Sequence, residues 1–248
     1  MLARISLMTV AMLALAVIPV QSKMTWSIDF ETGVALNGYN DVRIPGDTGT
    51  DISLTDDLNS HPRIVGRVRL GYMPAERHTL SVLFAPLRLR SDGTVNRAII
   101  FQNQIFDAGS ELEATYRFDS YRLTYRYDII KREKLNLGLG VTAKVRDAAI
   151  ILRGDGKVGE KTNTGFVPLI NFKLELQLGR RTYILLEGDA LAAPQGRAED
   201  VFLAFMTKYS ERAALKVGYR LLEGGADNDE VYNFTMVHYI LVGTVWSF

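Results

Sequence analysis

The sequence predicts an all-β fold, an antiparallel β-barrel that crosses a membrane with about ten strands. Three observations predict it. Apolar and polar side chains alternate in segment after segment, short polar turns alternate with longer polar stretches, and an alternating segment runs to the last residue, Phe248. Successive side chains of a strand point to opposite faces, so each alternating segment has one apolar and one polar face. A barrel strand in a membrane needs both, one for lipid and one for the interior.

The composition is compatible with such a barrel and excludes several other classes. The 248 residues suffice for one mid-sized barrel, and the chain's hydropathy is too close to neutral for a bundle of membrane helices. The absence of Cys excludes disulfides, thiolate metal sites, cysteine nucleophiles and an acylated cysteine. A formal net charge of +1 gives no reason to expect nucleic acid as a partner.

Residues 1–22 are predicted to be a cleaved signal peptide, which leaves residues 23–248 as the barrel. Arg4 supplies the positive charge, the 16 residues from Ile5 to Val20 are uncharged, and Ser22 completes a small-residue cleavage site. A membrane anchor is the alternative, but this run is shorter than the ~20 residues that a spanning helix needs. Nowhere else is an apolar run long enough to span, so strands must cross the membrane.

The first alternating strand covers residues 26–37, where Trp26, Ile28 and Phe30 alternate with Ser27, Asp29 and Glu31. Each alternating segment approaches the ~10 residues with which a tilted strand crosses the hydrocarbon core. The same pattern recurs in residues 63–72, 135–146, 166–178 and 215–221.

The connections between the segments set the strand count. Barrels join their strands by short turns on the periplasmic side and longer loops outside. Four short turns and five longer loops predict ten strands, with both termini periplasmic. The short turns are residues 74–77, 131–133, 179–181 and 210–212, and the longer stretches are residues 39–60, 91–110, 154–163, 193–198 and 223–229.

Two segments leave the count open. Pro86 interrupts the apolar series from Leu80 to Leu89, which predicts a bulge or a strand end there. Between residues 114 and 127 the apolar set changes parity at Asp119-Ser120. That change is either a slip within one strand or a hairpin turn, so twelve strands is the second alternative and eight the third.

Aromatic residues gather at one end of the inferred strands. Transmembrane barrels carry aromatic belts at the membrane edge, because amphipathic rings favour the headgroup level. If the short turns are periplasmic, the predicted girdle consists of Trp26, Tyr72, Tyr127, Tyr183, Tyr209, Trp246 and Phe248.

The inward-facing parity is rich in charge. A barrel of about ten strands has a narrow lumen, and buried charges must be paired or hydrated. The pattern therefore predicts a salt-bridged plug, and the alternative is a narrow path in which basic side chains favour anions. The predicted lumen cluster is Asp29, Glu31, Arg63, Arg67, Arg69, Arg122, Arg126, Lys144, Arg146, Lys173, Glu175, Glu187, Asp189, Lys216 and Arg220.

No motif identifies a catalytic or metal site. His61 follows an acidic stretch with Asp56 and Asp57, and an aspartate can orient a histidine that activates water, but a lone histidine near carboxylates is far more often an ordinary loop residue. His78 sits beside a short turn, and His238 shares the lipid-facing parity. The aspartates of residues 40–59 match no EF-hand spacing. We predict no catalytic residues, no metal and no cofactor.

The last nine residues, Ile240 to Phe248, place an aromatic residue at the end and apolar residues at alternate positions before it. This stretch resembles the C-terminal signal read by the barrel-assembly machinery of Gram-negative bacteria, with Thr244 a mild departure. The chain from signal peptide to terminus thus resembles a bacterial outer-membrane β-barrel protein. The resemblance implies an outer-membrane location and two kinds of partner, the assembly machinery and the surrounding lipids and lipopolysaccharide.

Three functions stay open at this stage. The first is a non-enzymatic barrel with a mostly occluded lumen and a structural or surface-interaction role through its loops. The second is a narrow, anion-preferring channel. The third is a lipid-modifying enzyme or protease. The strand number resembles that of omptin proteases, but their paired-aspartate and aspartate–histidine motifs are not found, nor is the Ser–His pair of outer-membrane lipases. The sequence does not indicate an oligomeric state.

Overall fold

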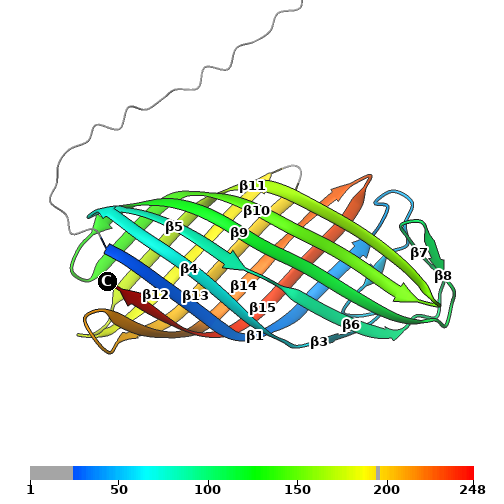
Figure 1. Ribbon diagram of the computed structural model, residues 1–248, viewed down its shortest axis with the longest axis horizontal. Coiled ribbons are helices and arrows are strands. Elements are labelled where there is room, and N and C mark those ends of the chain that lie inside the picture. Colours follow the sequence, from blue (N-terminus) through cyan, green and yellow to red (C-terminus); the bar gives the residue numbers. More distant parts are fainter. Residues whose placement is uncertain (1–24, 194–195) are drawn as a thin grey trace, which may run out of the picture.

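The computed structural model describes residues 25–193 and 196–248, which form a closed antiparallel barrel (Figure 1). The predicted signal peptide lies outside the described residues. Pairing of the first and last strands, from Ser27–Ser247 to Arg43–Tyr232, closes the wall. The strands of the wall are β1 (Thr25–Arg43), β4 (Arg63–Ala75), β5 (His78–Ala85) continued by β6 (Arg88–Thr94), β9 (Glu111–Lys131), β10 (Leu135–Gly154), β11 (Lys157–Gln177), β12 (Thr182–Ala193), β13 (Gly196–Lys208), β14 (Ala213–Asn228) and β15 (Val231–Ser247).

The wall therefore has ten strands, as predicted, because β5 and β6 pair in succession with β9 and act as one strand. Four further strands lie in the loops: β2 (Ile52–Ser53), β3 (Asn59–His61), which continues the line of β4, β7 (Ile99–Phe101) and β8 (Gln104–Phe106). The described part of the chain contains no helix that is long and apolar enough to cross a bilayer.

Both described termini lie at one end of the barrel, which we call the turn end. Phe248 N–H donates to the Trp26 carbonyl at 2.9 Å and so ties the two termini together. The four short connections, residues 76–77, 132–134, 178–181 and 209–212, belong to the same end. The opposite end, which we call the loop end, carries the two long connections, residues 44–62 and 95–110, with the β7–β8 hairpin, and also the two-residue turns that follow β10 and β14 (Figure 1).

The two faces of the wall exchange polarity part of the way along the strands. On β9 the outward residues from Tyr121 to Ile129 are apolar, whereas Arg117 and Asp119, nearer the loop end, are charged. The inward residues change in the opposite sense, from Arg122 to buried Tyr116. A barrel wall that extends beyond the membrane meets water outside and encloses an apolar core inside, so the exchange marks the edge of the lipid-facing band.

The parity change at Asp119-Ser120 is this polarity exchange and not a turn. β9 pairs with β10 without a shift from Asp128 to Glu113, so the hairpin alternative and the count of twelve strands are wrong. Pro86 does end a strand, as predicted, and Leu87 and Leu89 beyond it are buried in the interior.

Several stretches predicted as loops are strands. Residues 154–163 form the end of a hairpin whose turn is only Asp155-Gly156, with positive φ angles of 51° and 70°. Positive φ at both central positions is the signature of a type I′ turn, which suits Asp-Gly. The outer faces of these stretches are polar because they stand clear of the lipid-facing band, not because they lack strand pairing.

The loop end is filled by apolar side chains from the first two long loops. Buried residues there include Ile44, Leu58, Phe101 and Phe106, which join Leu112 and Leu152 of the wall in one hydrophobic cluster. The interior consequently has an apolar half at the loop end and a charged half towards the turn end.

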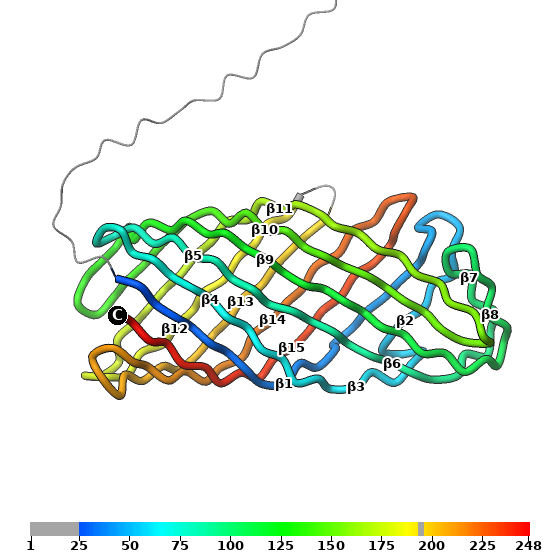
Figure 2. The backbone as a smooth tube through the Cα atoms, viewed as in Figure 1, coloured from blue at the N-terminus to red at the C-terminus, as the bar shows by residue number. Residues whose placement is uncertain are grey.

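Among the described strands, the pairing leaves a wide gap on one side of β11. The β11–β12 ladder stops at Ile170–Ala190, while β11 continues to Lys157 along its other neighbour, β10. Figure 2 shows β12 and β13 ending well short of the β10–β11 hairpin. Pro168, two residues beyond the last pair, has no backbone N–H to donate, which suits an edge.

Candidate functional site

Ion pairs cross the charged half of the lumen from wall to wall. Arg220 of β14 donates to Asp200 Oδ1 at 2.7 Å and to Glu31 Oε2 at 2.9 Å. Arg67 of β4 reaches the same two carboxylates, with Nε 3.1 Å from Glu31 Oε2 and Nη2 3.3 Å from Asp200 Oδ2. Since β4 and β13 are not neighbours in the wall, the Arg67–Asp200 pair spans the interior.

Arg122 of β9 connects a third part of the wall to the same centre. Its guanidinium donates to Asp189 Oδ2 and to Asp200 Oδ2, each at 2.6 Å. The other oxygen of Asp189 accepts from Thr142 Oγ1 at 2.6 Å and from Asn171 Nδ2 at 2.8 Å. Satisfied lone pairs on both sides are what allow such charges to be buried.

The pairing continues towards the turn end. Lys216 Nζ donates to Asp29 at 2.8 Å and to Glu31 at 2.7 Å, and Arg69 Nη1 donates to Glu187 at 3.0 Å. Together these residues form what we call the lumen network, and all but Asp29 and Arg69 are buried. Its members are Asp29, Glu31, Arg67, Arg69, Arg122, Glu187, Asp189, Asp200, Lys216 and Arg220.

Nine residues of the predicted lumen cluster meet in this network, and Lys173 and Glu175 form a separate pair at 2.9 Å. Arg63, Arg126, Lys144 and Arg146 have no ion-pair partner among the described residues. The sequence prediction missed Asp200. Its strand has apolar residues on both faces around Phe202 and Leu203, so alternation did not assign its parity.

Carboxylate oxygens of Asp29, Glu31 and Glu187 lie within 4.8 Å of one another. Such a cluster can hold a cation, but these three acids already face Lys216, Arg69 and Arg220. The chain's own cations balance their charge.

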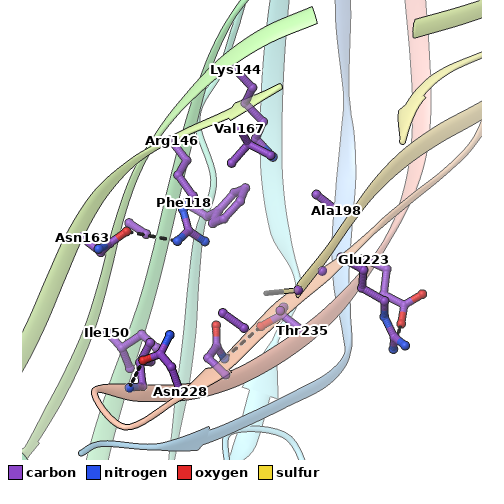
Figure 3. Close-up of a pocket in the computed structure, with 18 of the residues that line it drawn as sticks. Phe118, Lys144, Arg146, Ile150, Asn163, Val167, Ala198, Glu223, Asn228 and Thr235 are labelled. Carbon is purple, nitrogen blue, oxygen red and sulfur yellow. Dashed lines mark hydrogen bonds and ion pairs between the residues drawn. The ribbon is translucent and has the colours of Figure 1, made fainter. Parts of the chain in front are cut away.

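On the loop-end side of the network, in the apolar half of the interior, lies a cavity of about 830 Å³ (Figure 3). Lys144 and Arg146 of β10 project into it beside Phe118, opposite Ala198 and Thr235. Its lining also includes the carboxylates of Glu223, Asp229 and Glu230 and many apolar side chains, among them Tyr116, Ile150, Val167, Leu191, Leu222 and Val231.

Lys144 is the least ordinary residue of this cavity. Its side chain is only 3% exposed, and its ammonium lies 4.6 Å from the centroid of the Phe118 ring. Arg146 beside it donates to Asn163 Oδ1 at 3.1 Å, while its buried Nε has no hydrogen-bond partner. Two neighbouring cations thus face the cavity without a carboxylate of the described chain in contact.

The cavity reaches the gap between β11 and β12, because Phe166 and Val167 of β11 and Leu191 of β12 line it, and we call this gap the lateral window. Its edge towards the turn end is the Ile170–Ala190 ladder pair. Nearer the loop end, Lys161 Nζ donates to Glu230 at 3.0 Å. Phe166 belongs both to the cavity lining and to the outer surface, where it is 67% exposed.

The aromatic residues predicted as a girdle lie at the turn end. The rings of Trp26 and Tyr72 are 4.5 Å apart, and Tyr127 packs edge-on against His78 at 5.0 Å. Tyr209, Trp246 and Phe248 are exposed on the outside. Tyr183 differs, because its side chain faces the interior. It pairs with buried Met206 and has the same parity as buried Leu185, and Lys208 Nζ lies 4.8 Å from the centroid of the Tyr183 ring.

The three histidines all lie on the outer face. His61 pairs with Asp92 of β6, not with the acidic stretch before it. His78 and His238 contact the hydroxyls of Tyr125 and Tyr219, at 2.9 and 2.5 Å. Asp57 of that acidic stretch accepts hydrogen bonds from Arg97 at both carboxylate oxygens, at 2.9 and 2.6 Å. These hydrogen bonds lower the pKa of the Asp57 carboxyl.

Comparisons with known proteins support the fold and leave the role open. No family model and no curated protein sequence matches the chain. The outer membrane protease OmpT from Escherichia coli is similar in structure, with a TM-score of 0.55 and 9% identity over 90% of this chain and 97% of OmpT. Ail of Yersinia pestis, solved with the heparin analogue sucrose octasulfate, gives a TM-score of 0.42 and 10% identity over 90% and 99%. OprG from Pseudomonas aeruginosa gives 0.39 and 10% over 90% and 95%.

At these identities the likeness concerns the fold alone, and the proteins that share it are outer-membrane proteins. The closed ten-stranded wall, its lipid-facing band and this likeness lead to one conclusion: the chain has the fold of a bacterial outer-membrane β-barrel protein.

Proposed function

We propose that the protein is a non-conducting outer-membrane barrel that presents a recognition cavity at its loop end. The observation that carries the proposal is the lumen network, in which Arg67 and Arg122 join opposite parts of the wall through Asp200. A lumen crossed by short, buried ion pairs is a rigid support and a poor conduit.

The channel alternative draws its support from the excess of basic residues inside. Within the network, however, the cations are matched by acids, and their ion pairs cross the interior. The enzyme alternatives require a histidine or carboxylates near a substrate site. No histidine is among the described residues that line the cavity, and of its carboxylates Glu223 and Glu230 are paired with Arg197 and Lys161.

Planar-bilayer recordings test the non-conducting barrel. We expect the wild-type protein to give no steady openings, because ion pairs fill the lumen. Replacing Arg67 and Arg122 together by Ala removes two of the side chains that cross it, and we expect openings in that variant. Steady wild-type openings that disappear in the Arg67→Ala, Arg69→Ala double variant would support the anion channel and contradict the proposal.

We also propose that the turn end is periplasmic and the loop end faces the exterior, as in barrels with short periplasmic turns. The lipid-facing band then contacts outer-membrane lipids and lipopolysaccharide, and the last strand serves the assembly machinery.

Epitope tags test this orientation. We expect a tag between Asp229 and Glu230, in the β14–β15 turn, to be stained by antibody on intact cells. A tag between Arg132 and Glu133, in a turn at the opposite end, should be stained only after the outer membrane is opened. The reverse pattern would contradict the orientation.

A further inference from the structure

We propose that the loop-end cavity binds a single-chain anionic amphiphile, such as a long-chain fatty acid, which enters from the membrane through the lateral window. The inference deepens the proposed recognition role by naming the class of ligand. It rests on the unpaired cations, the shape of the cavity and the position of the window.

The head of the ligand is indicated by Lys144 and Arg146. A buried charge without a partner is costly, and proteins almost always pair or hydrate such groups. Lys144 is nearly inaccessible, has no ion-pair partner in the described chain, and borders the cavity. The partnerless Nε of Arg146 beside it offers a second donor. One anionic group placed between them would satisfy both.

The tail of the ligand is indicated by the rest of the lining. Beyond the two cations, Phe118, Ile150 and Leu222 offer apolar surface, and about 830 Å³ lies within the range of small-molecule sites. Lys161 and Arg197, the other lining cations, are already paired with Glu230 and Glu223. The free positive charge is therefore confined to one place, which fits a single charged head and an uncharged chain.

The route is indicated by the window. The apolar band ends on β9, β10 and β11 at three outward residues that lie side by side. These are Tyr121, its partner Val145, and Phe166, which pairs with Val145. Ile170, at the edge of the window towards the turn end, faces outward and is 56% exposed. The window thus begins in the lipid-facing band, so that an amphiphile in the outer leaflet can slide its head inward past Val167 and Pro168.

Native mass spectrometry of the full mature protein, delipidated in a nonionic detergent and mixed with oleate, tests the inference. We expect one bound oleate per barrel and an increase in the thermal midpoint. Lys144→Met should weaken oleate binding by about tenfold or more, because a charge-assisted contact is lost. The matched control is Lys161→Met, which removes a lysine of the same cavity that is paired and more exposed, and it should bind oleate nearly as wild type does.

Folding is read from the same proteins without ligand. Removing an unpaired buried cation should leave the thermal midpoint of Lys144→Met unchanged or higher, so weaker binding is not a sign of misfolding. Val167→Trp should obstruct the window and also lower oleate affinity.

Two further probes separate the head from the tail. Oleyl alcohol has the chain without the charge, and inorganic phosphate has charge without a chain; neither should raise the midpoint as oleate does. The inference is overturned if oleyl alcohol binds as tightly as oleate, if phosphate alone stabilises equally, or if Lys144→Met binds oleate as wild type does. Conductance is recorded separately, so failure of the non-conducting barrel would be distinguished from failure of the ligand.

Discussion

Arg220→Met is expected to lower the free energy of unfolding by about 3–5 kcal/mol, the range for removing one partner of a buried ion pair. Arg220 is 1% exposed and donates to both Asp200 and Glu31, so its loss leaves two carboxylates short of a partner inside the barrel. Methionine fills most of the space, so the effect reports the charge more than a cavity. The measurement is the denaturant midpoint in detergent micelles, followed by the shift in gel migration before and after boiling.

Arg197→Met is the matched control. Arg197 also pairs with a glutamate, Glu223, but its side chain is 47% exposed at the loop end. Exposed ion pairs contribute only ~0–1 kcal/mol, so the midpoint should hardly move. Equal, small effects of both substitutions would show that the lumen network does not hold the barrel together.

Val141→Arg is expected to destabilise the folded barrel in bilayers by about 2–4 kcal/mol, the cost of an arginine on the lipid face near the midplane. Val141 faces outward on β10, is 63% exposed, and lies between its partners Tyr125 and Ile170 within the apolar band. On a surface in water the same substitution would change little, usually within ±0.5 kcal/mol. Refolding into vesicles of defined lipid, followed by denaturant titration, gives the difference.

The control for this prediction is Val158→Arg on β11. Val158 is also outward and 50% exposed, but it lies next to the β10–β11 turn, well beyond the apolar band. It should tolerate arginine in the same vesicles. Equal tolerance at both positions would contradict the assignment of the band to lipid.

The course of β9 shows where sequence reasoning stopped. Its alternation does change at Asp119-Ser120, but a period-two pattern cannot tell a turn from an exchange of polarity between the two faces. The distinction depends on where the membrane ends, and the strand pairing with β10 decides it. The loop prediction for residues 154–163 failed for the same reason, since polarity outside the band was interpreted as absence of structure.

The network shows a second limit. The alternation of side chains along each strand predicted that Glu31, Arg67 and Arg220 face the interior, because the face to which a residue points depends only on its position within its own strand. It could not say that they share partners, since Glu31 and Arg220 are 189 positions apart along the chain. Asp200, the acid that pairs with three arginines, was missing from the predicted lumen cluster because its strand is apolar on both faces.

By itself the sequence determined the class of fold, the number of strands and the charged character of the lumen, because side-chain alternation and turn residues act over a few neighbouring positions. Only the tertiary structure decided which charges meet, that Lys144 is left without an ion-pair partner, and that β11 beyond Ile170 is unpaired on its β12 side, beside a cavity. These features arise from contacts between strands far apart in the chain. Their geometry is set by the closure of the barrel, which no single segment encodes.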